Sequence, residues 1–395
     1  MKTNWSIVHN DERISITEVN DKKYVEFKTK DFARIVFQSQ TYECNPRDVF
    51  DFKLNVERGN TKIKILVNWY NEEGTRRYRS YIEKKSKLSA PDEMKSFSID
   101  VVVYAFSDAI MTLGDVEVAL SGKYQPKNVT MCAIKQLVPC YSNTHPDIIL
   151  KTYLDKIDEI CDKHNPDIIV MGEHTHNLGC EEMFGERYQF IEEDGHIIKA
   201  FREKAKERKI FISGSFHIKD GYQKYNRALL IDRQGEIIAR YDKTHLTIAE
   251  YEFGITPGND IPVVETEIGR IGFMICWDLW FPGFTMNLFN KNCDIIVNPT
   301  RGTGGPQKHA VSYTSGAYLI CSGSEGTTRI QDKNGDSIDT VEDKGYAVAT
   351  VDLNEPEWLM QLSVGGGTNG EGRNVYMYEQ RPDLYGSLAD VELLK

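Results

Sequence analysis

Residues 167–173 read DIIVMGE, a short apolar run that ends in a carboxylate. The runs IFISGS at 210–215 and DIIVN at 294–298 are also short and do not alternate regularly between apolar and polar side chains. Strands that are covered on both faces show this pattern. Amphipathic segments that suit helices lie between these runs, at 146–164 and 195–208. The second half of the chain is therefore predicted to be α/β, with inner strands buried under helices.

The N-terminal third has a different pattern, in which short alternating runs are separated by turn-forming residues. In 62–65, KIKI, polar and apolar side chains alternate with the period of a half-buried strand. This pattern predicts an antiparallel β-sandwich over residues 1–124. The stretch 121–128, SGKYQPKN, is polar and contains Gly and Pro. We place the domain boundary there and expect the second domain over residues 129–390.

Composition excludes several classes of protein. The 395 residues leave room for two or three packed units, and 40% hydrophobic with 27% charged residues are typical of a globular chain. The formal net charge of -11 disfavours nucleic acid and anionic membranes as partners. No signal-peptide core opens the sequence, and no segment approaches the ~18 consecutive apolar residues of a membrane span. The 8 cysteines are scattered without CxxC pairs, so we expect a cytoplasmic protein with reduced thiols.

Three segments place a reactive side chain near the end of a predicted strand, where loops form clefts in open α/β sheets. They carry the carboxylate of Glu173, the ammonium of Lys243 and the thiol of Cys276. Together these groups suit nucleophilic catalysis: the thiol attacks, the carboxylate takes its proton and the cation stabilises oxyanion charge. Each residue alone has an ordinary structural explanation, as a buried Cys or a solvated surface charge. Only the combination points to an enzyme.

The three segments resemble the motifs of the nitrilase (carbon-nitrogen hydrolase) superfamily. IIVMGE is similar to the family's strand ending in Glu, YDKTHL to its Lys motif, and GFMICWDLWFP to its strand ending in Cys. The intervals, 70 residues from Glu173 to Lys243 and 33 from Lys243 to Cys276, are family-like. The resemblance covers about 129–390 and implies Cys276 as nucleophile, Glu173 as general base and Lys243 as oxyanion stabiliser. Further stretches resemble the family: YNRALLID at 225–232, FGITPG at 253–258, IIVNP at 295–299 and QRPDLY at 380–385.

The resemblance also implies further residues for the site. A second carboxylate should follow the lysine: Glu250, seven residues past Lys243, fits the family spacing, and Glu252 is the alternative. The backbone N–H of Trp277 would join Lys243 in the oxyanion hole if the chain turns sharply after the strand. Trp280 stands where relatives often have Arg, which disfavours an acidic substrate and favours a neutral or aromatic one.

By resemblance, the catalytic half should be a four-layer α-β-β-α sandwich that pairs into homodimers or higher homo-oligomers. Its expected reaction is hydrolysis of a non-peptide carbon-nitrogen bond through a thioester on Cys276. The substrate would be a small amide, a carbamoyl compound or a nitrile, with an amidase favoured over a true nitrilase. The family needs no metal or organic cofactor. His174 and His176, together with the more distant His245, could suggest a metal site. A third ligand at the spacing of a metal-binding motif is absent, however.

Two other functions stay open. One is acyl transfer on the same fold, in which an amine replaces water in the second step. The other is a non-catalytic binding or scaffold protein that uses the β-sandwich for recognition. The sandwich pattern is similar to jelly-roll carbohydrate-binding modules, so a glycan is a candidate partner of the N-terminal domain.

Overall fold

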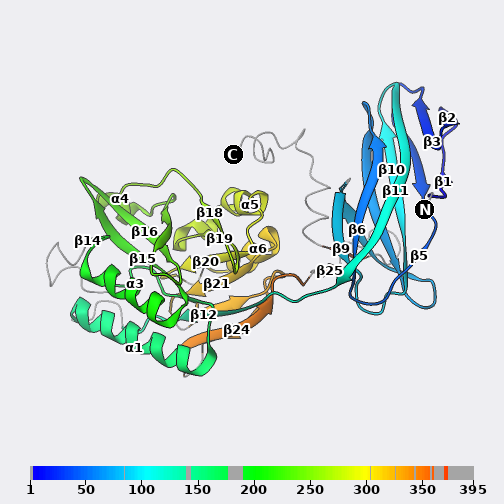
Figure 1. Ribbon diagram of the computed structural model, residues 1–395. Coiled ribbons are helices and arrows are strands. Elements are labelled where there is room, and N and C mark those ends of the chain that lie inside the picture. The colour runs from blue at the N-terminus through cyan, green and yellow to red at the C-terminus, as the bar shows by residue number, and fades with distance from the viewer. Residues whose placement is uncertain are drawn as a thin grey trace. The chain divides into compact units, whose positions relative to one another are not determined.

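The computed structural model describes residues 3–83, 85–138, 144–176, 190–302, 304–324, 326–341, 344–355, 358–359 and 369–371. These residues form two compact units (Figure 1). The first contains the chain up to Gln125 together with two short strands, β25 (Trp358–Leu359) and β26 (Asn369–Glu371). The second contains Pro126 to Glu355. None of the helices within the described ranges has the length and apolar character needed to cross a bilayer.

The N-terminal unit consists of two β-sheets whose inner faces share one core. In β6 (Asp48–Glu57) buried residues alternate with more exposed ones, as expected of a strand with one face in a core. The inward residues that follow the buried Asp48 are apolar: Phe50, Phe52, Leu54 and Val56. From the other sheet, Trp69 and Phe97 enter the same core with ring centroids 5.1 Å apart. The predicted N-terminal β-domain of two packed sheets is confirmed.

The strands of the first sheet follow the order β1 (Ser6–His9), β4 (Ala33–Gln38), β10 (Ser96–Ala105), β7 (Lys62–Tyr70), β8 (Arg76–Ile82), β26 and β25, with β5 (Tyr42–Glu43) paired to β10. The second sheet follows the order β2 (Ile14–Val19), β3 (Lys22–Phe27), β11 (Ala109–Lys123), β6 and β9 (Lys85–Ser89). All pairs are antiparallel except β26 with β8, where Asn369 lies opposite Tyr78. The sequence places the catalytic domain up to residue 390, whereas β25 and β26 pair inside the N-terminal unit; the domain limits stay a prediction.

The second unit also contains two sheets, and their central strands are parallel. One has the order β17 (Ile237–Asp242), β16 (Gln223–Ile231), β15 (Phe211–Asp220), β13 (Ile168–Val170), β12 (Asn128–Ile134) and β24 (Tyr346–Asp352), with β14 (Ile191–Glu192) paired to β15. The other has the order β18 (Val263–Thr266), β19 (Gly269–Phe273), β20 (Ile295–Pro299), β21 (Tyr318–Ser322), β22 (Arg329–Gln331) and β23 (Ser337–Thr340). Parallel pairing joins β12 to β13 to β15, and β19 to β20 to β21.

Helices cover the outer faces of these two sheets (Figure 1). Helices α1 (Pro146–His164) and α3 (His196–Arg208) pack their apolar faces on one sheet, for example through Tyr153 and Phe201. Helices α5 (Pro282–Asn290) and α6 (Gln307–Ser315) pack on the other, and the two inner sheet faces share a single large core. The predicted α-β-β-α layer order is confirmed. The short helix α4 (Ile248–Glu252) lies near the strand ends, where the candidate site forms.

Candidate active site

Lys243 directly follows strand β17, and its ammonium group lies between two buried carboxylates. Its Nζ atom donates to Glu173 Oε1 at 3.0 Å and to the two oxygens of Glu250 at 3.0 and 2.9 Å. The side chains of Lys243 and Glu173 are 1% and 3% exposed. Burial opposes the charged ammonium, but the two carboxylates outweigh it and raise the pKa of Lys243 above its usual value. Lys243 is therefore a cation at neutral pH.

Glu173 lies just beyond the carboxyl end of strand β13, where the sequence predicts it. Besides Lys243, the side-chain amide of Asn226 donates to its Oε1 at 2.9 Å. Burial by itself would raise the pKa of Glu173, but Lys243 and Asn226 stabilise the ionised form and hold the pKa below its ordinary value. Glu173 is thus ionised at neutral pH, which is the form that can accept a proton.

Glu250 is held in place by the first turn of α4. Thr247 caps this helix: its hydroxyl accepts from the Glu250 N–H at 3.3 Å, while Glu250 Oε2 accepts from the Thr247 N–H at 2.8 Å. The same carboxylate accepts from Lys243. Glu252 ends the helix and is exposed. Of the two alternatives, the structure places Glu250 against the lysine.

Cys276 lies at a sharp turn after strand β19. Its φ angle is 44°, in the left-handed region that residues other than glycine rarely adopt. Burial and the Glu173 carboxylate raise the pKa of the thiol, although Lys243 and the Thr300-Arg301 segment act in the opposite direction. The resting group is therefore a thiol at neutral pH. A base must take its proton before it can attack as a thiolate.

Asp278 joins the nucleophile turn to the segment that carries the lysine. It is fully buried in the short 3-10 turn η1 (Cys276–Trp280). Its Oδ2 accepts from the Tyr241 hydroxyl at 2.7 Å and from the Ile275 N–H at 2.8 Å. Its Oδ1 accepts from the His245 N–H at 3.2 Å and contacts Nδ1 of the same ring at 2.9 Å. One carboxylate thus fixes the thiol segment relative to the ammonium segment.

Asn226 is a site residue that the sequence reasoning did not single out. It is fully buried on β16, and its Nδ2 atom lies 2.9 Å from Glu173 Oε1 and 2.8 Å from Glu250 Oε1. Its Oδ1 accepts from the Ser215 hydroxyl at 2.9 Å, which fixes the orientation of the amide. The available signal was a polar side chain inside the run YNRALLI, where a buried strand would be apolar.

A cavity of about 350 Å³ brings the predicted residues together. Among its lining residues are Glu173, Lys243, Glu250 and Cys276. The same wall contains residues that sequence reasoning did not assign to the site, among them His217, Phe253, Ile255 and Arg301. Phe253 and Ile255 lie in the family-like stretch FGITPG, whereas His217 and Arg301 come from distant parts of the chain that no quoted motif covers.

Two histidine rings pack against each other in the cavity wall, with their planes tilted by 47°. The ring centroids of His174 and His217 are 4.0 Å apart, and both side chains are buried. Burial, followed by neighbouring positive groups, lowers the pKa of each imidazole well below its usual value. Both rings are therefore neutral at neutral pH and add no charge to the cavity.

The two tryptophans that the sequence proposes for substrate contacts lie on the nucleophile turn. Trp277 and Trp280 are 40% and 44% exposed, and their ring centroids are 5.9 Å apart. Neither is among the described residues that line the cavity. Their side chains can therefore contact only a part of a substrate that extends out of the cavity.

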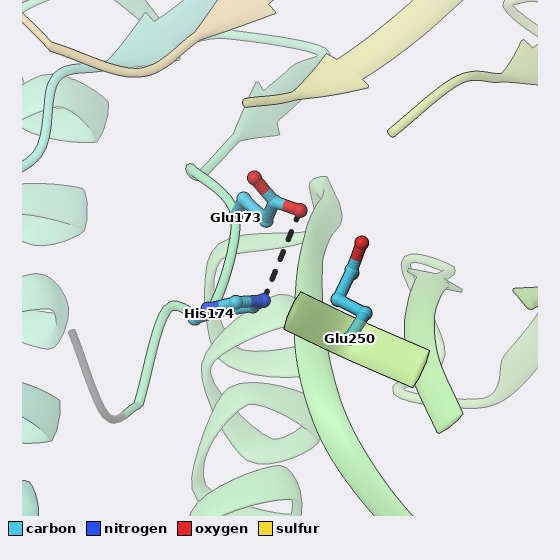
Figure 2. A group of neighbouring side chains, drawn as sticks. All are labelled: Glu173, His174 and Glu250. Atoms are coloured by element: carbon cyan, nitrogen blue, oxygen red, sulfur yellow. Dashed lines mark ion pairs between the residues drawn. The ribbon is translucent and has the colours of Figure 1, made fainter. Parts of the chain in front are cut away.

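Glu173, His174 and Glu250 are also close enough to hold a metal ion, because one ligand atom from each lies within 4.8 Å of the others (Figure 2). His174 Nε2 lies 3.8 Å from Glu173 Oε1, a contact without ionic character while the imidazole is neutral. The Lys243 ammonium already contacts both carboxylates, and a divalent cation there would meet its repulsion. We therefore interpret these three side chains as neighbours of the Lys243 ammonium and not as a metal site. His245 contacts Asp278 instead.

Comparison with known proteins supports the same fold and family. The model of the family "Carbon-nitrogen hydrolase" matches residues 133–356. A deaminated glutathione amidase from Dictyostelium discoideum is 28% identical over 159 residues, covering 35% of this chain and 55% of that protein. A citrullinase from Francisella tularensis is 29% identical over 127 residues, covering 31% of this chain and 44% of that protein. The chain thus spans about half the length of these curated relatives.

Solved structures show the same fold. The crystal structure of the NitFhit protein of C. elegans aligns with a TM-score of 0.50 at 20% sequence identity, over 58% of this chain and 62% of that one. This likeness concerns the fold alone. The family match covers more than half of the sequence and includes Glu173, Lys243 and Cys276. The chain therefore belongs to the carbon-nitrogen hydrolase family, the nitrilase superfamily.

Proposed function

We propose that this protein hydrolyses the carbon-nitrogen bond of a small amide or carbamoyl compound, with Cys276 as the nucleophile. One observation carries the proposal: the Lys243 ammonium lies between the Glu173 and Glu250 carboxylates, in a cavity that Cys276 also lines. A thiol, an ionised base and a fixed cation are the groups that acyl transfer through a thioester requires. Two of the relatives are named as an amidase and a citrullinase, which supports amide and carbamoyl substrates.

The charges of the site suit a two-step reaction. Glu173 takes the proton of the Cys276 thiol, and the sulfur attacks the carbonyl carbon to form a tetrahedral intermediate. Lys243 and the backbone N–H of Trp277 stabilise its oxyanion. Glu173 then gives the proton to the nitrogen, the carbon-nitrogen bond breaks, and ammonia or an amine leaves a thioester on Cys276. Water, deprotonated by Glu173, attacks the thioester and releases the acid and the thiol.

In this proposal Glu250 is a positioning residue. It holds the Lys243 ammonium in place, while Glu173 keeps its own hydrogen bond to the same ammonium. The hydrogen bonds from Asn226 hold the two carboxylates close together although their charges repel. This arrangement keeps Glu173 ionised, in the cavity that Cys276 also lines, before substrate arrives.

The test is ammonia release from a panel of amides, carbamoyl compounds and nitriles. We expect release by the wild type and a loss of at least 1,000-fold in Cys276→Ala, since removal of a catalytic nucleophile costs roughly that much or more. Cys161→Ala is the matched control, because Cys161 is a half-buried thiol on helix α1 of the same unit. It should retain activity.

Two outcomes would contradict the proposal. If the wild type and Cys276→Ala release ammonia at equal rates, Cys276 is not the nucleophile. If no compound reacts and mass spectrometry finds no acyl adduct on Cys276, the non-catalytic alternative is favoured. Product analysis with an added amine separates hydrolysis from acyl transfer, since a transferase would form the substituted amide in place of the free acid.

A further inference from the structure

Ser215 on strand β15 contacts the turn that carries Glu173. Its backbone N–H donates to the Gly172 carbonyl at 3.3 Å, and its carbonyl accepts from the Thr175 N–H at 2.9 Å. Its hydroxyl oxygen accepts from the His174 N–H at 3.2 Å. Glu173 lies between Gly172 and His174 in the chain. Ser215 therefore holds this turn on both sides of the residue that bears the carboxylate.

The hydrogen bond from the His174 N–H supports a strained part of this turn. His174 has a φ angle of 55°, in the left-handed region that residues other than glycine rarely adopt. Such a conformation persists only where surrounding contacts hold it. Removing the Ser215 hydroxyl would take one of these contacts from the residue next to Glu173.

The same hydroxyl also reaches the Glu173 carboxylate, through Asn226. It donates to Asn226 Oδ1 at 2.9 Å, and Asn226 Nδ2 donates to Glu173 Oε1 at 2.9 Å and to Glu250 Oε1 at 2.8 Å. Ser215 and Asn226 are both fully buried, where an acceptor without a donor is costly. The hydroxyl satisfies the amide oxygen, so the NH2 side of the amide faces the two carboxylates.

We propose that Ser215 is a positioning residue for the general base Glu173. Its hydroxyl links the backbone of the turn that carries Glu173 to the amide that binds the Glu173 carboxylate. Without the hydroxyl, the amide stabilises the ionised carboxylate less, and Glu173 takes up a proton at a higher pH. This inference rests on the proposed function, in which Glu173 must be ionised to accept the proton of the thiol.

The first test measures the pKa of Glu173 and needs no turnover. NMR follows the titration of glutamate labelled with ¹³C at the side-chain carboxyl, and Glu173→Gln identifies the resonance. We expect the pKa of Glu173 to rise by roughly 0.5–1 pH unit in Ser215→Ala, since part of a hydrogen bond to a charged group is lost.

Ser213→Ala is the matched control for this titration. Ser213 lies on the same strand and is buried, and its hydroxyl has no hydrogen-bond partner among the residues that the structure describes. Its removal should leave the pKa of Glu173 unchanged. The melting temperature of each variant shows whether it is folded.

The groups that also act on Glu173 are the same in the wild type and in Ser215→Ala. The charged and titratable groups of the described cavity wall come from several elements: Lys243 after β17, Glu250 on α4, His174 in the turn itself, His217 on β15, Cys276 after β19 and Arg301 after β20. The substitution removes none of them. A change in the pKa of Glu173 therefore reports the loss of the hydroxyl and its effect on the amide.

The second test is the pH dependence of kcat/KM, with the amide of the panel that the wild type hydrolyses fastest. Two hydrogen bonds of ordinary strength correspond to roughly 5- to 30-fold in rate, so kcat of Ser215→Ala should fall by that factor. The acidic limb of the profile should move to higher pH, because only the ionised carboxylate accepts a proton. A merely structural role would lower the rate at every pH and leave this limb in place.

Asn226→Ala tests whether Ser215 acts through the amide. If it does, the pKa shift in the double variant is smaller than the sum of the two single shifts. Additive shifts would overturn the inference, as would an unchanged pKa of Glu173 in Ser215→Ala or an equal shift in Ser213→Ala. Failure of the proposed function looks different: no amide shows Cys276-dependent turnover, while the NMR titration still reports whether Ser215 acts on Glu173.

Discussion

Replacing Asp278 by asparagine should destabilise the catalytic unit strongly, although the two side chains have nearly the same shape. In the wild type, the Tyr241 hydroxyl and the Ile275 N–H face one oxygen of Asp278, and the His245 N–H, the His245 ring and the Thr244 hydroxyl face the other. An amide turns one of these oxygens into an NH2 group that faces a backbone N–H, which can only donate. That hydrogen bond is then lost in a fully buried place, and the other donors lose their charged acceptor.

The magnitude follows from the kind of bond that is lost. Hydrogen bonds to a charged group contribute about 1.5–3 kcal/mol each, so the lost bond together with the weakened ones gives roughly 3–6 kcal/mol in the free energy of unfolding. For a unit of this size, 1 kcal/mol lowers the melting temperature by about 2–4 °C, which predicts a fall of roughly 6–24 °C. Activity should fall as well, because Asp278 fixes the thiol segment relative to the lysine segment.

Differential scanning calorimetry measures this effect, with Asp155→Asn as the matched control. Asp155 lies on the surface of helix α1 and pairs with Lys151, so its loss should change stability by less than about 0.5 kcal/mol. A melting temperature for Asp278→Asn within 2–3 °C of the wild type, with activity retained, would refute the reasoning that this carboxylate holds the site together.

Other predictions concern the lysine and the thiol. Glu250→Gln should lower kcat at least tenfold, because Lys243 loses half of its counter-charge. The control Glu252→Gln should keep kcat within about twofold of wild type. Steady-state kinetics measures both variants, and equal effects would contradict the assignment of Glu250. Glu173→Gln should speed alkylation of Cys276 by iodoacetamide at neutral pH. The Glu173 carboxylate raises the thiol pKa, so its removal lowers that pKa. At a fixed neutral pH the thiolate fraction then rises by up to tenfold for each unit by which the pKa falls. Alkylation is followed by mass spectrometry, and slower alkylation would refute this sign.

The part of the site that could be predicted from sequence consists of residues at the ends of apolar strands. Glu173, Lys243 and Cys276 each follow such a run, and the carboxyl ends of strands meet at one side of an α/β unit. The choice between Glu250 and Glu252 was also available in principle. Thr247 and Glu250 form a Thr-x-x-Glu capping box, which fixes where α4 begins and which way its first carboxylate points.

The rest depended on contacts between segments that are distant in the chain. His217 and Arg301 line the cavity and Asn226 contacts Glu173, each from a different strand, and nothing in their neighbouring residues shows which groups they will face. The expectation of a neutral or aromatic substrate relied on Trp280, a residue at a motif position, and it stays a prediction. Trp280 is not among the described residues that line the cavity, whereas Arg301, at the end of a different strand, is. A local motif therefore does not show which residues line the cavity.

The left-handed backbone conformation of Cys276 sets folding stability against the reactivity of the thiol. A non-glycine residue in this conformation costs roughly 1–2 kcal/mol, and that strain is present whether or not the sulfur reacts. A glycine at position 276 would adopt the same angle without strain, but it would have no nucleophile. At position 276, the residue that removes the strain is therefore one that makes the protein inactive. Selection for stability alone would favour that residue, and the thiol persists only where its chemistry is required.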